Sequence, residues 1–168
     1  MPLVLRPFID SDEAAARAGH EQMAGWEFLL QYDEDDSWAT WLDHHERLGS
    51  GESLPEGFVQ SAFLAAVVNG HLVGRVSIRF ALNDFLFRYG GHIGYGVLPQ
   101  HRRQGYATEI LRQALERLRL AGVERALVTC FDGKIGSAAV IEANGGKLEN
   151  IVPYKDDQLR RYWITTGQ

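Results

Sequence analysis

The feature that most constrains the fold is the stretch VLPQHRRQGYATEILRQALERL, from Val97 to Leu118, which runs from the end of a strand through a basic loop into a helix. From Ala107 onward, apolar residues recur at steps of three and four, while charged residues occupy the opposite face. This spacing predicts an amphipathic helix that ends near Gly122. One face of that helix is therefore expected to be buried.

The rest of the chain predicts strands and helices around this unit. The strongest signal is a hairpin, because Asn69-Gly70 suits a two-residue turn with positive φ between two apolar runs. Gly94 and Gly96 loosen the strand before the basic loop, which suggests a bulge or a close backbone approach. The expected strands cover residues 3–8, 61–68, 71–82, 92–98, 124–130, 147–152 and 159–166, the expected helices cover 10–26, 36–49, 107–122 and 135–144, and the stretch 82–91 is expected to be a loop.

Length and charge limit the classes of function. At 168 residues, a single domain over residues 1–168 is expected. The formal net charge of -5 argues against a nucleic-acid partner, which needs a basic face. No apolar run approaches the roughly 20 residues of a membrane span, and the N-terminus does not resemble a leader, so we expect a cytoplasmic protein with no membrane partner.

Disulfide and metal chemistry find little support in the sequence. Cys130 is the single cysteine, so an intrachain disulfide and a Cys-rich metal site are excluded, and we expect a buried thiol. The pair His44-His45 falls in a predicted helix, where adjacent residues face different directions and no third ligand is suitably spaced. We therefore expect no metal.

The basic loop has the chemistry of an anion site. The first backbone N–H groups of a helix have no partners inside it, and the helix dipole adds partial positive charge there. Gly105 and Ala107 leave room at the backbone, Arg102 and Arg103 add charge, and Thr108 offers a hydroxyl, which together suit a phosphate or pyrophosphate. The alternative is a solvated basic cap before an ordinary helix. Neither a dinucleotide fingerprint nor a P-loop fits elsewhere.

A family resemblance rests on this loop. The segment RRQGYA, from Arg102 to Ala107, resembles the acetyl-CoA signature Gln/Arg-x-x-Gly-x-Gly/Ala of the GNAT superfamily of N-acetyltransferases. The segments IGSAAVIEANGGKLEN and RRYWI resemble a bacterial subgroup of predicted acetyltransferases, and the likeness is strongest from Gly91 to Asn150. It implies an α+β, three-layer fold with a mixed, mostly antiparallel sheet of about six to seven strands and about four helices, splayed at the acetyl-CoA site.

The resemblance also implies how acetyl-CoA, the co-substrate, is held. Backbone N–H groups of the loop would bind the pyrophosphate, and the pantetheine arm would pair with the end of the preceding strand. Lys134 stands where the family commonly has Asn, so it is either a cofactor contact or a solvated lysine. The implied cofactor-binding residues are Gly96, Val97, Leu98, Arg102, Arg103, Gln104, Gly105, Tyr106, Ala107, Thr108, Lys134 and Ser137.

Catalytic roles follow by the same resemblance. The N–H near Val97 would polarise the thioester carbonyl as an oxyanion donor. Ile141 occupies the position where many members carry a tyrosine acid, so Tyr95 is taken as the substitute, with Tyr154 and Tyr162 as alternatives.

A base is also needed, because the acceptor amine is protonated at neutral pH. Some members use a carboxylate about a dozen residues before the signature glycine, where this chain has His92. A histidine that titrates near neutrality suits a general base. A structural role for a lone histidine at the start of a strand is the alternative.

The leading hypothesis is an acyl-CoA-dependent N-acyltransferase that moves an acetyl group to a primary amine of a small molecule or peptide by direct attack in a ternary complex. A buried Cys130 disfavours a covalent intermediate. The alternative is a catalytically weakened CoA-binding regulatory or sensor module. Asp84 and the acidic run 33–36 would suit a cationic acceptor. The chain is a monomer or, with Trp26, Phe85 and Phe87 exposed, a homodimer.

Overall fold

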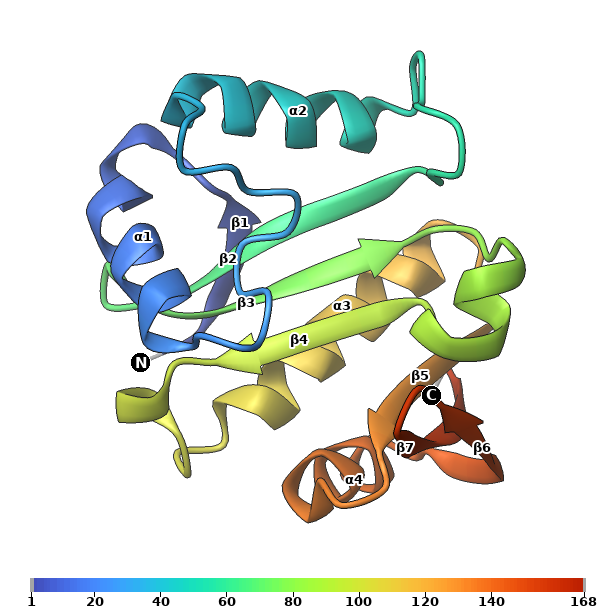
Figure 1. The fold of residues 1–168 in the computed structure, drawn as a ribbon. Coiled ribbons are helices and arrows are strands. Elements are labelled where there is room, and N and C mark those ends of the chain that lie inside the picture. Colours follow the sequence, from blue (N-terminus) through green and yellow to red (C-terminus); the bar gives the residue numbers. More distant parts are fainter. Residues whose placement is uncertain (1, 168) are drawn as a thin grey trace.

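The structure is a computed structural model that describes residues 2–167, and it is built around one seven-stranded sheet in the order β1-β2-β3-β4-β5-β7-β6 (Figure 1). The strands are β1 (Val4–Pro7), β2 (Ser61–Val68), β3 (His71–Arg79), β4 (Ile93–Val97), β5 (Arg125–Phe131), β6 (Lys147–Tyr154) and β7 (Asp157–Thr165). The α-helices are α1 (Glu13–Gln22), α2 (Trp38–Ser50), α3 (Tyr106–Leu120) and α4 (Ile135–Ala143), and the short helical segments are η1 (Asp10–Asp12), η2 (Leu86–Gly90) and η3 (Pro99–His101).

The sheet is mixed and mostly antiparallel, as predicted. Every neighbouring pair of strands is antiparallel except β4 and β5, which are parallel. The predicted hairpin joins β2 to β3, and Asn69 and Gly70 both have positive φ. The seven strands and four α-helices match the architecture that the sequence predicts.

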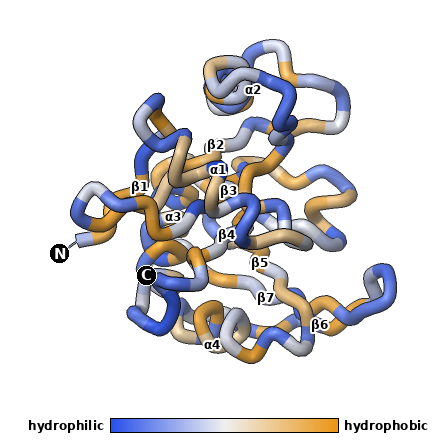
Figure 2. The backbone as a smooth tube through the Cα atoms, turned by 60° about the vertical axis from the view of Figure 1, so that its left-hand side comes forward, coloured by the Kyte–Doolittle hydropathy of each residue, from blue (hydrophilic) through white to orange (hydrophobic). Residues whose placement is uncertain are grey.

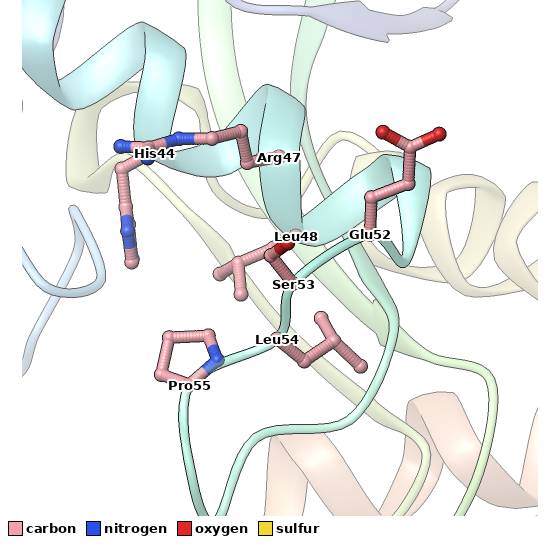
Figure 3. A pocket seen from close by; sticks show the side chains of 7 residues that line it. All are labelled: His44, Arg47, Leu48, Glu52, Ser53, Leu54 and Pro55. Atoms are coloured by element: carbon pink, nitrogen blue, oxygen red, sulfur yellow. The ribbon is translucent and has the colours of Figure 1, made fainter.

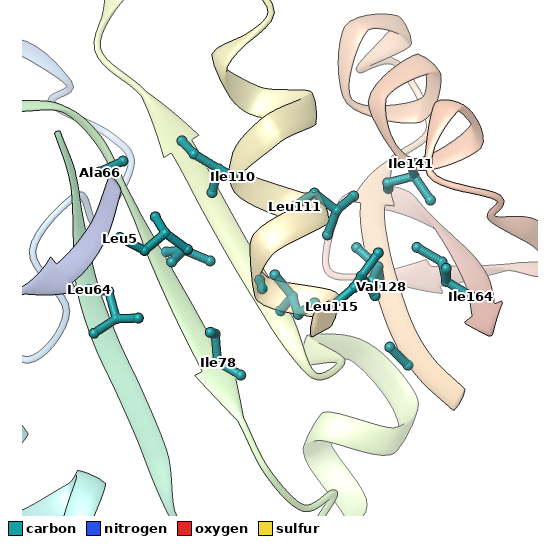
Figure 4. Packing of buried hydrophobic residues seen from close by; sticks show 14 of the residues in the cluster. Leu5, Leu64, Ala66, Ile78, Ile110, Leu111, Leu115, Val128, Ile141 and Ile164 are labelled. Atoms are coloured by element: carbon teal, nitrogen blue, oxygen red, sulfur yellow. The ribbon is translucent and has the colours of Figure 1, made fainter. Parts of the chain in front are cut away.

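Each face of the sheet carries its own apolar core, because strand residues alternate between the faces. In β2, Leu64 and Ala66 belong to the core under α3, whereas Phe63 and Ala65 belong to the core under α1 and α2. The apolar stripe of α3, with Ile110, is buried in the first core, close to residues of β5 and α4 (Figure 4). Figure 2 shows hydrophobic chain concentrated in the central strands and hydrophilic chain in the outer loops.

The first helix is shorter than predicted. Its hydrogen-bonded turns stop at Gln22, and the segment after it folds into successive turns in which the Trp26 N–H donates to Met23 O and the Phe28 N–H donates to Trp26 O. Before the helix, the Ile9 N–H donates to the Asp12 carboxylate across the short segment η1. Trp26 is thereby released from the helix and lies over the sheet.

The second departure is η2, where the sequence predicts a loop. Residues Leu86–Gly90 form one π-helical turn, and the Asn83 side chain accepts the Leu86 N–H at its start. Its last residues are fixed to two strands, because the Thr129 hydroxyl donates to Tyr89 O and the Arg79 guanidinium donates to Gly90 O. None of the helices within residues 2–167 has both the length and the apolar character of a membrane span.

Candidate active site

The two ends of β4 differ in how they pair. At its start, the His92 N–H donates to Leu127 O of β5 at 2.7 Å, and the Arg79 N–H of β3 donates to His92 O at 2.7 Å. Beyond Ile93, which is paired with Val128, no further β4 residue has a partner in β5. The strand therefore separates from β5 over the rest of its length, as the predicted splay requires.

The separation leaves backbone groups of a central strand without a neighbour on one side. Bonds to β3 use alternate positions of β4, since the Leu98 N–H donates to Val73 O and His92 O accepts from Arg79. The N–H groups of the intervening Tyr95 and Val97 consequently point towards the open side. Residues 94–96 are partly exposed although β4 lies mid-sheet.

The glycines of β4 do not mark a bulge. The register between β3 and β4 is unbroken from Gly74 opposite Val97 to Ile78 opposite Ile93. The alternative of a close approach holds, because a Cβ on Gly96 would lie 2.4 Å from the Trp26 ring. The splay arises on the β5 side of the strand.

The basic loop joins the open end of β4 to α3. Arg103 and Gly105 both have positive φ, and the Arg102 Nε donates to Val97 O at 3.1 Å. The Glu109 N–H is bonded to Gly105 O, so the N–H groups of residues 106–108 have no partner inside the helix. Nothing lies within 4 Å of the position that a Gly105 Cβ would occupy. This loop has the backbone geometry of an anion cradle.

The start of α4 faces the same opening. The Tyr95 hydroxyl donates to Ser137 O at 3.4 Å, which is longer than usual for such a bond. Burial, with a smaller contribution from Cys130, raises the pKa of Tyr95, so its hydroxyl stays protonated at neutral pH. Lys134 is exposed at the N-terminus of α4. Tyr95 therefore presents a proton donor beside the open end of β4.

His92 is fixed at the closed end. Its Nδ1 accepts the Leu127 N–H at 2.9 Å, and the ring is 5% exposed. Burial, together with the charge of Arg79, lowers the pKa of His92 to about 4. In this neutral ring Nε2 carries the hydrogen, so proton abstraction through Nδ1 would require the bond from Leu127 to break. A general base at His92 stays a prediction, and these contacts favour a positioning role.

Two other predicted features of the site lie in the core. Cys130 is buried as expected, and that burial raises the pKa of its thiol, so it is a poor nucleophile at neutral pH. Ile141, at the position where the family often has tyrosine, is fully buried in the core under α3. Neither side chain is arranged for chemistry.

The face of the sheet opposite to the Tyr95 side chain holds Arg75, which the sequence analysis does not single out. Arg75 of β3 is 3% exposed and donates to Glu27 O, Phe28 O and Gly94 O at 2.8 to 3.0 Å. Its guanidinium carbon lies 4.1 Å from the centre of the Trp26 ring. Arg75 thus holds the segment after α1 against β4 through hydrogen bonds to both.

A sequence signal for these residues did exist. Arg75 and Arg79 are charged residues in a largely apolar strand and stand at even spacing, which places both on one face of the sheet. The predicted acidic residues are less informative, since Asp84 is exposed and the Asp35 N–H within the acidic run donates to Asp33.

Two hollows occur elsewhere, on the α2 side of the molecule. One of about 90 Å³ lies between the end of α2 and the following loop, lined by His44, Leu48 and Pro55 among others (Figure 3). A groove of about 560 Å³ runs between β1 and α2, past Phe8, Trp41 and Phe63. Neither includes a residue of β4 or of the basic loop.

Comparison with known proteins decides the family. The family model described as the acetyltransferase (GNAT) domain matches residues 2–147. The chain belongs to the GNAT acetyltransferase family. A search of curated proteins finds no match.

Solved structures share the GNAT fold. They include yncA from Salmonella typhimurium with its cofactor acetyl-CoA (17% identity, TM-score 0.67, 99% of this chain and 95% of that chain covered). RimJ from Mycobacterium smegmatis, in complex with CoA-disulfide, has 20% identity and a TM-score of 0.73, over 97% of this chain and 81% of that one. The Salmonella typhimurium acetyltransferase that modifies the N-terminal serine of ribosomal protein L7/L12 has 19% identity and a TM-score of 0.68, over 97% and 94%.

Proposed function

We propose that this GNAT protein transfers an acetyl group from acetyl-CoA to a primary amine by direct attack in a ternary complex. The observation that carries the proposal is the open end of β4, where Tyr95 and Val97 direct N–H groups into the splay beside the loop at the start of α3. The related structures with acetyl-CoA and CoA-disulfide support it.

The binding residues divide by chemistry. The N–H groups of residues 103–108 surround the pyrophosphate, and the charges of Arg102 and Arg103 assist them. The pantetheine arm, an extended chain with amide groups, pairs with β4 from Gly96 to Leu98 as an added strand would. Gln104 completes the loop, and Lys134 and Ser137 stand at the start of α4, on the far side of the splay.

The chemical step needs a stabilised oxyanion and a protonated leaving group. Acetyl-CoA supplies the acetyl group as a thioester. The Val97 N–H donates to the carbonyl oxygen as the amine nitrogen forms its bond to carbon. The amine reaches the site as its neutral form, having lost one proton to solvent. The Tyr95 hydroxyl, held only loosely by Ser137 O, gives its proton to the sulfur as the carbon–sulfur bond breaks, and the proton that the nitrogen releases on becoming an amide restores Tyr95 through solvent. His92 keeps β4 in register, and a base role for it is a prediction.

A second candidate is a CoA-binding regulatory or sensor module with weak transfer activity. It is favoured by Ile141, which leaves no acid at the position where the family often has a tyrosine, and by the exposure of Lys134. Both candidates require acetyl-CoA binding. Only the enzyme releases CoA rapidly when an amine is added.

The test is a thermal-shift titration with acetyl-CoA, desulfo-CoA and ATP, followed by an assay of thiol release with a panel of amines. A ligand at 100 times its Kd stabilises a folded protein by about 2.7 kcal/mol, which corresponds to a rise in Tm of roughly 5–10 °C at this size. We expect that rise for the CoA compounds and not for ATP. No shift at millimolar acetyl-CoA would contradict both candidates, whereas a shift without amine-dependent thiol release would leave the sensor module.

A further inference from the structure

Arg79, at the end of β3, carries a charge without an acidic partner. None of the ion pairs formed among residues 2–167 includes it. A guanidinium has five N–H donors, yet within the described residues this one makes a single hydrogen bond, to Gly90 O at 3.3 Å. The neighbouring Arg75, by contrast, spends its donors on three backbone carbonyls. Arg79 therefore has donors available to a ligand.

The position of Arg79 places those donors one short acceptor's length from the reacting centre. Its guanidinium lies about 3.4 Å from where a Gly94 Cβ would be, on the face of the sheet that Trp26 covers at Gly96. Arg79 itself is only partly buried, and residues 94–96 are partly exposed. Val97 lies three residues beyond Gly94, which is about 10 Å along a strand. A ligand group at Arg79 is thus within about 10 Å of the thioester site.

The surroundings of Arg79 favour an anion. Arg75, Arg79 and His92 project from the same face of adjacent strands, and burial, with a smaller contribution from the charge of Arg79, lowers the pKa of both other groups. Burial lowers the pKa of Arg79 to about 10, so it remains charged at neutral pH. A partly buried charge costs free energy unless an opposite charge accompanies it. A chain with a net charge of -5 nevertheless keeps two charged guanidinium groups, those of Arg75 and Arg79, together on this face beside the neutral ring of His92.

We propose that Arg79 binds a carboxylate of the acceptor, so that the acceptor is an amine that also carries a carboxylate, as in an amino acid, and not a polyamine. This inference rests on the proposed transfer reaction and names the class of its second substrate. The planar fork of a guanidinium matches a carboxylate with two parallel hydrogen bonds, which fixes the acceptor in orientation as well as position. The amine is then directed along β4 towards the open end.

The experiment measures kcat/KM for thiol release with amino acids, their amides, short peptides and spermidine at fixed acetyl-CoA. For the best acceptor, we expect the acid to exceed its amide by about 10- to 100-fold, the range for a charge-assisted hydrogen-bonded pair. In Arg79→Gln this ratio should fall to near 1 through KM, and Arg79→Lys should be intermediate. The matched control is Arg47→Gln, an exposed arginine of α2 paired with Asp43, which should keep the ratio.

The outcomes separate this inference from the proposed function. The rise in Tm on adding acetyl-CoA should be the same in wild type and in Arg79→Gln. If acetyl-CoA gives no such rise in the wild type, the transfer reaction itself is rejected. An acid-to-amide ratio near 1 in wild type, a preference for spermidine, or a ratio that survives Arg79→Gln would overturn the role of Arg79. If no amine releases thiol, the same acids are titrated with desulfo-CoA present and the Tm is measured. If none of the acids raises the Tm, the role of Arg79 is overturned as well.

Discussion

The two ends of β4 show how one short strand can be both a structural joint and a binding surface. At the start, His92 is held on three sides: its N–H bonds to Leu127 O, its carbonyl accepts from Arg79, and its ring accepts the Leu127 N–H. At the other end, Val97 is bonded through its carbonyl to the side chain of Arg102, and its N–H faces the splay. The closed end stops the separation of the strands, and the open end exposes their backbone.

This difference shows what a splay needs. A strand that separates from its neighbour must be anchored, or the separation would extend along the sheet. Here the anchor uses a side chain, since the imidazole of His92 takes the place of a backbone acceptor for Leu127. The open end can then leave polar groups for a ligand, which an ordinary central strand cannot do without losing stability.

The largest expected effect comes from closing the space beside the open end. Gly105 has a φ of 82° and nothing within 4 Å of its missing Cβ. In Gly105→Val, the side chain would occupy the path of the phosphates, so we expect acetyl-CoA affinity to fall by about 1,000-fold, or ~4 kcal/mol. Isothermal titration calorimetry with acetyl-CoA measures this directly.

A matched control exists at the other end of α3. Gly122 also has positive φ, 88°, and open space around it, so Gly122→Val imposes the same backbone strain away from the loop. We expect both variants to lose similar stability and only Gly105→Val to lose acetyl-CoA. Equal affinities in the two variants would refute the anion cradle.

The next effect concerns the proton donor at the open end. Tyr95→Phe removes the hydroxyl and leaves the ring packed, so we expect turnover to fall by roughly 100-fold, with acetyl-CoA affinity unchanged. Burial raises the pKa of Tyr95, so no loss of its proton should appear in the pH profile between pH 6 and 9. Tyr162→Phe is the control, because Tyr162 is buried and its hydroxyl donates to Glu142. A larger loss of turnover in Tyr162→Phe than in Tyr95→Phe would place the acid elsewhere.

The sequence predicts most of the helices and strands around the two ends of β4. The period of the helix after Ala107 and the Asn69-Gly70 turn are local signals, and the helix and the hairpin that they predict are present. Gly105 in the basic loop has the positive φ that a glycine at a helix start allows. The seven strands follow from apolar runs separated by turn residues. These elements are determined by residues close together in the chain, and such local patterns can be read from the sequence directly.

The rest depends on contacts between distant segments. Nothing near Trp26 in the chain shows that Arg75, about fifty residues later, will bond Glu27 O and Phe28 O and end the first helix early. The π-helical turn before β4 is likewise fixed from β3 and β5, through Arg79 and Thr129. The ring of His92 accepts the Leu127 N–H only when β5 lies beside it, so the sequence alone predicts a base there and gives no sign of this contact.

The smallest expected effect is at the closed end. His92→Ala leaves the buried Leu127 N–H without its acceptor, which costs about 1–3 kcal/mol and lowers Tm by roughly 2–12 °C. Acetyl-CoA affinity should fall less than in Gly105→Val, because the loop itself is intact. Chemical denaturation and thermal melting at pH 7.5 measure the loss. A catalytic base would instead show normal stability with reduced turnover.

The pH dependence of stability tests the contribution of the buried His92 ring separately. The pKa of His92 is about 4 in the folded chain and near 6.5 when unfolded, so the unfolded chain binds more protons between these values. The free energy of unfolding therefore falls as pH is lowered from 6.5 towards 4, and His92→Ala should flatten that fall. His45, whose pKa is also lowered to about 4 mainly by burial, contributes in the same window, so His45→Gln removes a separate share. If the slope of His92→Ala equals that of wild type, the ring of His92 does not hold the closed end, and the splay must be anchored by the backbone alone.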